Sequence, residues 1–438
     1  MKNVLILGAG MVTRPMVDYL LKHDNIAVTL ADVDPAKAKA IIDGRENGCT
    51  ANLDVNDKPG LSALIEKADL VVSLVPYTFH PLVAELCIAA KKNLVTASYV
   101  SPAMQAMDQA AKDAGILIMN EIGLDPGIDH MSAMRIIHDV EDRGGKVKSF
   151  YSYCGGLPAP DANTNPLGYK FSWSPRGVVL AGRNSAQYLK EGSAVEIASA
   201  DLFTHTWKLD FDTVGTLCAY PNRDSMPYRE IYGLKGIDTL YRGTLRYPGW
   251  CETWKALVDI GFLSLDKRDD LSGKTFKELT ADLAGVDAEG DVRAALAEKF
   301  NITDAGILDR MAWLGLFSDE KVADEETVLD VLSAQLLVKM QYDEGERDMI
   351  VLHHDFLAEF PDGSTKKITS TLVDYGIPGG DSAMARTVSL PAAIAVRLIL
   401  EEQIDLKGVH IPVDPAIYEP VLDELETLGI AFEEKVSD

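Results

Sequence analysis

Basic residues are scarce in this 438-residue chain, where 42 Lys and Arg stand against 67 Asp and Glu for a formal net charge of −25. Nucleic acids and anionic membrane surfaces bind clustered cations, so this balance argues against both as partners. An anionic small molecule would need a local cationic pocket in such an acidic protein. We therefore expect small-molecule partners and look for arginines that could hold them.

Cysteine is also sparse, and the chain has no long apolar run. Its five cysteines are odd in number and widely spaced (Cys49, Cys87, Cys154, Cys218, Cys251), with neither a metal-ligand spacing nor a disulfide framework. No stretch approaches the roughly 20 apolar residues of a membrane span, and Met1–Asn3 is too short for the basic start of a signal peptide. These absences predict a cytoplasmic protein with reduced thiols and no metal site.

The first 130 residues alternate between apolar runs and helical patterns, which is typical of a doubly wound α/β domain. The expected strands are Val4–Leu7, Val28–Ala31, Ala51–Val55, Leu70–Val75, Leu94–Ala97 and Ile116–Met119. The expected helices are Met11–His23, Pro35–Asp43, Gly60–Lys67, Pro81–Ala90 and Pro102–Ala114. A parallel sheet of this kind binds its ligand at the carboxyl ends of the strands.

A glycine turn follows the first strand and predicts a dinucleotide site. Gly8-Ala9-Gly10 lies between strand and helix, and Asp32 closes the second strand. The first glycine permits the tight turn, and the second leaves room for a pyrophosphate. Asp32 can accept hydrogen bonds from an adenosine ribose. Thr13 replaces the third glycine of the fingerprint, so the helix and strand should pack slightly less closely.

The pattern changes beyond the first domain. Lys148–Cys154 reads as a strand, and Met349–Phe360 and Lys366–Asp374 flank a turn, so we predict a mixed or antiparallel second sheet. The expected domains are a Rossmann domain over 1–130, to which 386–438 return, a substrate and dimerisation domain over 131–265 and 346–385, and a helical insertion over 266–345.

Polar residues that could carry chemistry follow the expected strands. Asp125, in the turn-rich run Asn120–His130, would project into the ligand crevice or cap the following helix, where His130 is expected to be packed. A long loop over 155–176 is of a length that is usually functional. Arg223 and Arg246 are candidate clamps for carboxylates, although each could pair with a surface acid instead. Cys154 is more readily explained as a small buried thiol than as a nucleophile.

These motifs together resemble the saccharopine reductase family, the glutamate-forming saccharopine dehydrogenases of lysine metabolism. The resemblance covers nearly the whole chain and rests on residues 76–81, 98–99, 120–130, 152–160, 165–174, 220–225, 243–247, 346–349 and 371–376. It implies a cytoplasmic homodimer that joins 2-aminoadipate 6-semialdehyde to glutamate and reduces the imine with a nicotinamide hydride, giving saccharopine.

The resemblance also implies a set of site residues. The substrate would contact Ser98, Tyr99, Asp125, Arg223, Thr244, Leu245 and Arg246. The dinucleotide would contact Gly8, Ala9, Gly10, Met11, Val12, Asp32, Asp54, Val55, Val75, Pro76, Tyr77, Ser98, Asp125, Lys170, Phe171 and Ser172. Proton transfer would fall to Asp125 and Tyr99, with Cys154 as the third candidate.

One departure concerns the cofactor. Fungal members of the family use NADPH and have an arginine after the second strand, whereas this chain has Asp32-Val33-Asp34 there. A carboxylate repels a 2′-phosphate and favours a free ribose hydroxyl. We therefore predict that NAD(H) is favoured, with NADP(H) as the family alternative.

Two other functions are compatible with a dinucleotide site. One is a related imine reductase of polyamine metabolism, such as a carboxynorspermidine dehydrogenase, whose cationic substrate would need carboxylates rather than arginines. The other is a dinucleotide-sensing regulator without turnover, which would not need Arg223, Arg246 and the long aromatic loop.

Overall fold

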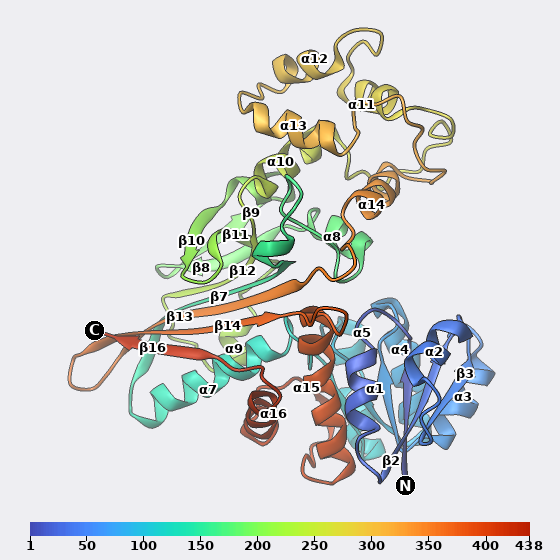
Figure 1. Ribbon diagram of the computed structural model, residues 1–438. Helices are drawn as coiled ribbons and strands as arrows, with labels where there is room; N and C mark the ends of the chain where they lie inside the picture. Colours follow the sequence, from blue (N-terminus) through green and yellow to red (C-terminus); the bar gives the residue numbers. More distant parts are fainter. The chain divides into compact units, whose positions relative to one another are not determined.

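The computed structural model describes residues 1–438 and divides into two compact units (Figure 1). Unit 1 comprises residues 1–146, 360–362 and 380–433, and unit 2 comprises residues 147–359, 363–379 and 434–438. Each unit has its own sheet and core.

Unit 1 is built on a seven-stranded parallel sheet with strand order β15-β6-β5-β4-β1-β2-β3. The strands are β1 (Lys2–Leu7), β2 (Ile26–Asp32), β3 (Gly48–Asn52), β4 (Leu70–Ser73), β5 (Asn93–Val95), β6 (Leu117–Met119) and β15 (Gly408–His410). The strand order reverses between β1 and β4, so the crevice for a ligand lies at the carboxyl ends of these strands. The prediction of a doubly wound α/β fold is confirmed.

Helices cover this sheet and connect its strands. They are α1 (Arg14–Leu20), α2 (Pro35–Ile42), α3 (Lys58–Lys67), α4 (His80–Ala90), α5 (Pro102–Gln105), α6 (Asp108–Ala114), α7 (Ile128–Asp142), α15 (Ala383–Leu400) and α16 (Pro415–Thr427). A buried cluster joins α3, α4 and α6 to one face of the sheet, while α1 contacts α15 and α15 contacts α16.

Several predicted boundaries in unit 1 were wrong. The third strand is Gly48–Asn52 rather than Ala51–Val55, and the expected helix Pro102–Ala114 is divided into α5 and α6. The first helix begins at Arg14, three residues later than predicted, and the helix after Asp125 begins at Ile128 with Gly127 as its N-cap. Asp125 therefore does not cap this helix.

The chain returns to unit 1 near its end. Helix α15 packs there, and β15 adds a strand beside β6. Contrary to the expectation from the sequence, α15 could cross a membrane by length and composition alone, but 78% of it is buried inside the structure. This burial is typical of a core helix in a folded domain.

Unit 2 contains a mixed nine-stranded sheet with the order β10-β11-β12-β7-β13-β14-β16, in which β8 pairs with β12 and β9. The strands are β7 (Lys146–Pro158), β8 (Ala186–Lys190), β9 (Ser193–Ile197), β10 (Trp207–Phe211), β11 (Gly215–Pro221), β12 (Thr239–Arg246), β13 (Asp348–Glu359), β14 (Thr365–Tyr375) and β16 (Glu433–Ser437). The predicted hairpin is confirmed, with Val351 opposite Val373. Strand β7 continues to Pro158, four residues beyond the predicted end.

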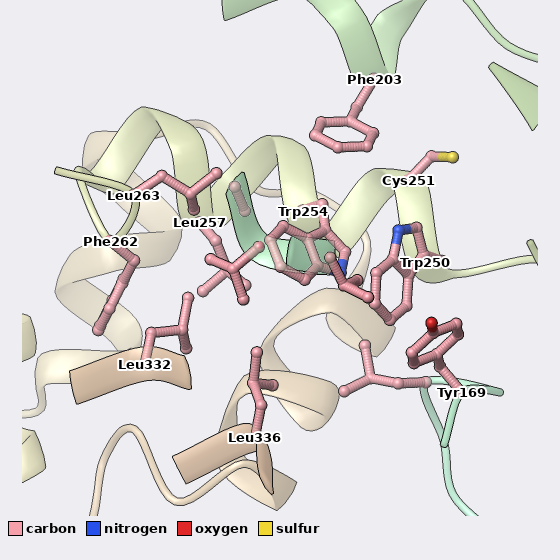
Figure 2. Close-up of a cluster of buried hydrophobic side chains, with 14 of the residues drawn as sticks. Tyr169, Phe203, Trp250, Cys251, Trp254, Leu257, Phe262, Leu263, Leu332 and Leu336 are labelled. Carbon is pink, nitrogen blue, oxygen red and sulfur yellow. The ribbon is translucent and has the colours of Figure 1, made fainter. Parts of the chain in front are cut away.

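The helices of unit 2 pack with its sheet around a common core. It contains α8 (Pro175–Ala181), α9 (Tyr228–Ile231), α10 (Trp250–Ile260), α11 (Phe276–Ala284), α12 (Val292–Lys299), α13 (Ala305–Trp313) and α14 (Val328–Lys339). Helix α10 carries Trp250, Trp254 and Leu257 into a buried cluster that also holds Tyr169 (Figure 2). This cluster surrounds the end of β12, where Arg246 lies.

Candidate active site

The turn after β1 has the backbone that a dinucleotide site requires. Gly8 has φ +105°, and a Cβ there would lie 3.0 Å from the carbonyl oxygen of Leu74. A Cβ on Gly10 would meet no protein atom within 4 Å. The protein itself therefore needs glycine only at the first position, and the open space at Gly10 fits the close approach of a pyrophosphate.

Thr13 has a role that its place in the glycine fingerprint does not predict. Its buried hydroxyl donates to the Gly8 carbonyl at 2.9 Å. The side chain that replaces the third glycine therefore closes the turn by a hydrogen bond.

Asp32 is fixed at the end of β2 beside this turn. Its Oδ2 accepts from the Ala9 amide at 2.7 Å, and its Oδ1 accepts from the Asp34 amide at 2.8 Å. Each carboxylate oxygen can accept a further hydrogen bond, so the geometry fits a ribose hydroxyl. Asp34 caps α2 by accepting from the Ala36 amide at 3.0 Å.

The other residues expected near the dinucleotide follow the ends of strands at the same edge of the sheet. Asp54 and Val55 follow β3. Asp54 is held in a local turn, because its Oδ1 accepts a hydrogen bond from the Asn56 amide. Val75 and Pro76 follow β4, and Tyr77 is 71% exposed. Ala9 is buried, whereas Met11 is 59% exposed and Val12 is half-buried.

Tyr99 and Asp125, the two leading candidates for proton transfer, are brought together. The Tyr99 hydroxyl donates to Asp125 Oδ1 at 3.0 Å. Asp125 precedes a cis peptide bond to Pro126, and its side chain is half-buried. In this pair the Tyr99 phenol can donate a proton and the Asp125 carboxylate can accept one.

A buried acid–base cluster is formed by residues on either side of Asp125 in the chain, and it was not predicted from the sequence. His130 is fully buried in α7, with its Nε2 2.8 Å from Glu121 Oε2 and its Nδ1 3.7 Å from Asp129. Glu121 Oε1 also accepts from the Val100 amide at 2.9 Å, and Asp129 accepts from the Gly127 amide at 2.6 Å. The cluster therefore fixes the segments on either side of Asp125. The four titratable residues of the eleven-residue run Asn120–His130 (Glu121, Asp125, Asp129 and His130) were the available signal.

Arg246 in unit 2 is a buried guanidinium without a carboxylate partner. Its exposed fraction is 6%, and its centre lies 4.8 Å from the Tyr169 ring, 5.4 Å from Trp250 and 6.0 Å from Tyr220. Its Nη1 donates to the Leu245 carbonyl at 2.7 Å, and its Nε has no acceptor. Buried arginines are normally paired, so this site is suited to an anion.

The other expected substrate residues of unit 2 surround or extend this site. Thr244 pairs with Cys154 across β12 and β7, and with Tyr220 across β12 and β11. Leu245 is fully buried and supplies the carbonyl that Arg246 contacts. Cys154 is buried, as expected for a packed thiol.

Arg223 is not part of the Arg246 cluster. It is exposed, has φ +55°, and follows β11 five residues beyond Cys218, which lies opposite Arg246. At about 3.3 Å per residue the two arginines are roughly 15 Å apart along the sheet. They could bind separate ends of an extended molecule but not one carboxylate.

The segment Lys170-Phe171-Ser172 is buried within unit 2. Lys170 forms an ion pair with Glu346, and Phe171 donates its amide to the Met340 carbonyl at 2.9 Å. The Ser172 hydroxyl is buried and has no hydrogen-bond partner. Lys170 thus has a structural partner, whereas Ser172 keeps capacity for a ligand. Its contact with the nicotinamide stays a prediction.

These features define a Rossmann-type dinucleotide-binding protein with a separate unit that holds a buried cationic site. Residues 4–119 match the family model of the saccharopine dehydrogenase NADP binding domain, and residues 123–430 match that of the saccharopine dehydrogenase C-terminal domain. The chain belongs to the saccharopine dehydrogenase family.

Individual relatives agree with this family. The chain is 47% identical to the saccharopine dehydrogenase [NADP(+), L-glutamate-forming] of Pyricularia oryzae over 99% of both chains. It is 40% identical to bovine mitochondrial alpha-aminoadipic semialdehyde synthase over 98% of this chain and 47% of that protein. The apo structure of the L-Glu-forming saccharopine dehydrogenase of Saccharomyces cerevisiae matches with a TM-score of 0.92 and 44% identity over 100% of both chains.

Proposed function

We propose that this protein is a nicotinamide-dependent oxidoreductase that interconverts saccharopine with 2-aminoadipate 6-semialdehyde and L-glutamate. Full-length similarity to L-glutamate-forming enzymes supports the reaction. The observation that carries the substrate class is Arg246, a buried guanidinium without a carboxylate of its own. A substrate with three carboxylates supplies the missing anion.

The proposed chemistry needs a balanced transfer of protons. In the direction of synthesis, the glutamate amine attacks the aldehyde carbon, the carbinolamine loses water, and the resulting imine is reduced. The bound dinucleotide supplies the hydride. Tyr99 and Asp125, which share a hydrogen bond of 3.0 Å, are proposed to protonate the departing hydroxyl and to accept the proton of the amine. Cys154 is the third candidate for this role.

The substrate would be oriented by residues of the second unit. We propose that Arg246 binds one carboxylate and that Arg223, with Thr244 and Leu245, contacts another part of the same molecule. Separation along the sheet suits a substrate that bears carboxylates at both ends. A cationic polyamine precursor would be repelled by the buried charge of Arg246, so the polyamine alternative is disfavoured.

The test of this function is the oxidation of NADH or NADPH with both the semialdehyde and glutamate present. We expect turnover only when both substrates are supplied, and the reverse reaction with saccharopine and the oxidised cofactor. Turnover with the semialdehyde alone would point to another reductase. Cofactor binding without any turnover would support the dinucleotide-sensing alternative.

We also propose a preference for NAD(H), although the relatives and the family model are named for NADP. The support is the fixed carboxylate of Asp32, which is held by the amides of Ala9 and Asp34 where a 2′-phosphate would lie. Asp32→Asn removes the charge and keeps an acceptor, so it should raise the ratio of NADPH to NADH efficiency about ten-fold or more. Asp34→Asn preserves the helix cap and is the control. A wild-type enzyme that is faster with NADPH at equal subsaturating concentrations would contradict the proposal.

A homodimer is the assembly that the resemblance implies, and one surface of unit 2 supports it. Half-buried aromatic rings gather on β7, β8, β10 and β13 (Tyr151, Tyr188, Trp207, Phe211, His353). Light scattering should give twice 47.7 kDa. Trp207→Asp should lower this mass, whereas Lys208→Glu, on the opposite side of β10, should not. A monomeric wild-type protein would contradict the proposal.

We propose a cytoplasmic location, supported by the five free cysteines. Fractionation of cells that express the full chain should recover it in the soluble cytoplasmic fraction. Recovery with membranes or outside the cytoplasm would contradict this.

A further inference from the structure

His80 is a buried residue to which neither the reaction nor the resemblance assigns a role. It is the first residue of α4, directly after the exposed turn at Tyr77, and its exposed fraction is 2%. Its ring lies between the ends of β4 and β5, at the edge of the sheet where the dinucleotide is expected to bind.

Three hydroxyl groups surround the ring. Its Nδ1 is 2.9 Å from the hydroxyl of Ser73, the last residue of β4. Its Nε2 is 2.8 Å from the Ser98 hydroxyl and 3.3 Å from the Thr96 hydroxyl, both of which follow β5. No carboxylate contacts the ring, so no opposite charge offsets the cost of burying a charged imidazole.

The ring is therefore neutral and its hydrogen bonds are directional. Burial lowers the pKa of His80 from 6.5 to about 4. A neutral imidazole carries a single N–H, so one ring nitrogen donates while the other accepts. The nitrogen that carries the proton therefore determines whether the Ser98 hydroxyl donates to the ring or accepts from it, and the same holds for the Ser73 hydroxyl.

We propose that His80 is a positioning residue that orients the Ser98 hydroxyl toward bound substrate or cofactor. Ser98 is only half-buried, so its hydroxyl can face a ligand while it bonds to the ring. Its amide donates to Thr96 Oγ1 at 3.3 Å, and its carbonyl accepts from the Glu121 amide at 3.1 Å. The backbone of Ser98 is held by these contacts, and His80 removes the remaining freedom of the side chain. This inference rests on the proposed function insofar as Ser98 is a ligand contact.

The arrangement differs from ordinary packing in one respect. An apolar residue of similar size would fill the space but leave the fully buried Ser73 hydroxyl without its hydrogen-bond partner. The ring satisfies this hydroxyl and, through the opposite nitrogen, fixes Ser98. One residue therefore joins the ends of two neighbouring strands at the point where the ligand is expected.

The test compares His80→Gln with His80→Asn, each alone and combined with Ser98→Ala. The Gln amide reaches the position of Nε2 and can still bond to Ser98, whereas the Asn amide reaches only the position of Nδ1 and keeps the Ser73 contact. We expect His80→Asn to raise the KM for saccharopine or the Kd for the dinucleotide about five- to ten-fold, the effect of one or two hydrogen bonds. His80→Gln should stay within about three-fold of wild type.

The decisive measurement is made on the double variant that combines His80→Asn with Ser98→Ala. When Ser98 is already alanine, His80→Asn should change KM and Kd by less than about two-fold, because a residue that acts through another has no separate effect. An equal loss in both backgrounds, or no loss in either, would overturn the proposal. Failure of the proposed function would appear differently, as a wild-type enzyme without saccharopine turnover. The role of His80 would then be decided by the Kd for the dinucleotide, measured by fluorescence in the same proteins. A Kd that is unchanged by His80→Asn would also overturn the proposal.

Discussion

Replacing Arg246 by methionine should weaken substrate binding and stabilise the ligand-free protein at the same time. The guanidinium is buried, has no carboxylate partner, and leaves its Nε without an acceptor. Methionine is similar in length and can lie against the same aromatic rings without a charge. Substrate binding weakens while the stability of the ligand-free protein rises only if the Arg246 charge serves to bind a ligand rather than to stabilise the fold.

The loss in binding follows from the hydrogen bonds that a carboxylate would make. A hydrogen bond to a charged group contributes about 1.5–3 kcal/mol, and a planar guanidinium can make two to one carboxylate. Loss of both should raise the KM for saccharopine about 150-fold or more. Arg246→Lys should restore little of this, because an ammonium lacks the planar fork and stacks poorly on Tyr169 and Trp250.

The gain in stability follows from the cost of burying the charge. Desolvation of an ion costs several kcal/mol, whereas a cation–π contact returns about 0.5–2 kcal/mol. Three rings and one backbone carbonyl offset much of this cost, but the Nε, which has no acceptor, keeps a desolvation penalty. We expect the free energy of unfolding to rise by about 1–3 kcal/mol and the melting temperature by a few degrees.

The assay combines saccharopine kinetics with thermal melting of the ligand-free enzyme. Arg242→Met is the matched control, because Arg242 lies on the same strand, is equally buried, and has partners of its own, among them the Tyr228 ring at 4.4 Å. This control should melt lower than wild type and keep its KM. An Arg246→Met variant that melts lower with an unchanged KM would show that the arginine serves the fold, and the reasoning would fail.

Three further predictions concern the two units separately. Gly10→Ala should leave the melting temperature of the ligand-free protein unchanged and raise the Kd for the dinucleotide about ten-fold or more. Gly8→Ala, at φ +105°, should lower the free energy of unfolding by about 1–3 kcal/mol. Equal melting temperatures for the two variants would contradict this. Glu346→Gln leaves the Lys170 ammonium buried and unpaired, so it should cost about 3–5 kcal/mol in denaturant unfolding, and a loss below about 1 kcal/mol would be inconsistent with a buried pair. Because burial lowers the pKa of His80 from 6.5 to about 4, its contribution to stability is fully present above pH 6.5 and is lost as the pH falls toward 4; His80→Gln should flatten the fall in melting temperature over this range, and parallel curves would contradict it.

The fold of unit 1 could be predicted because its strands are buried on both faces. Strands β1 and β4 read as continuous apolar runs, and the glycine turn marks where the first one ends. The predicted position of the third strand was wrong because Gly48–Asn52 lies at the edge of the sheet and has no apolar run. Periodicity reports burial, so it locates central strands well and edge strands poorly.

Contacts between distant segments could not be predicted from local patterns. Strand β15 joins the sheet beside β6, although Gly408 lies 291 positions after its partner Leu117 in the chain. Lys170 is paired with a glutamate 176 residues away, and His80 meets Ser98 across two strand ends. Such pairs depend on strand order and register, which apolar spacing does not encode.

Arg246 shows how this limit affects the assignment of a site. From the sequence, Arg223 and Arg246 were equivalent candidates, because each could either bind a carboxylate or pair with an acid at the surface. What separates them is the environment: one is exposed, whereas the other is enclosed by Tyr169, Tyr220 and Trp250, which come from three separate segments. In a chain with 67 acidic residues, a buried arginine that meets none of them is suited to a carboxylate from elsewhere, and this environment, rather than the charge itself, supports the proposed substrate class.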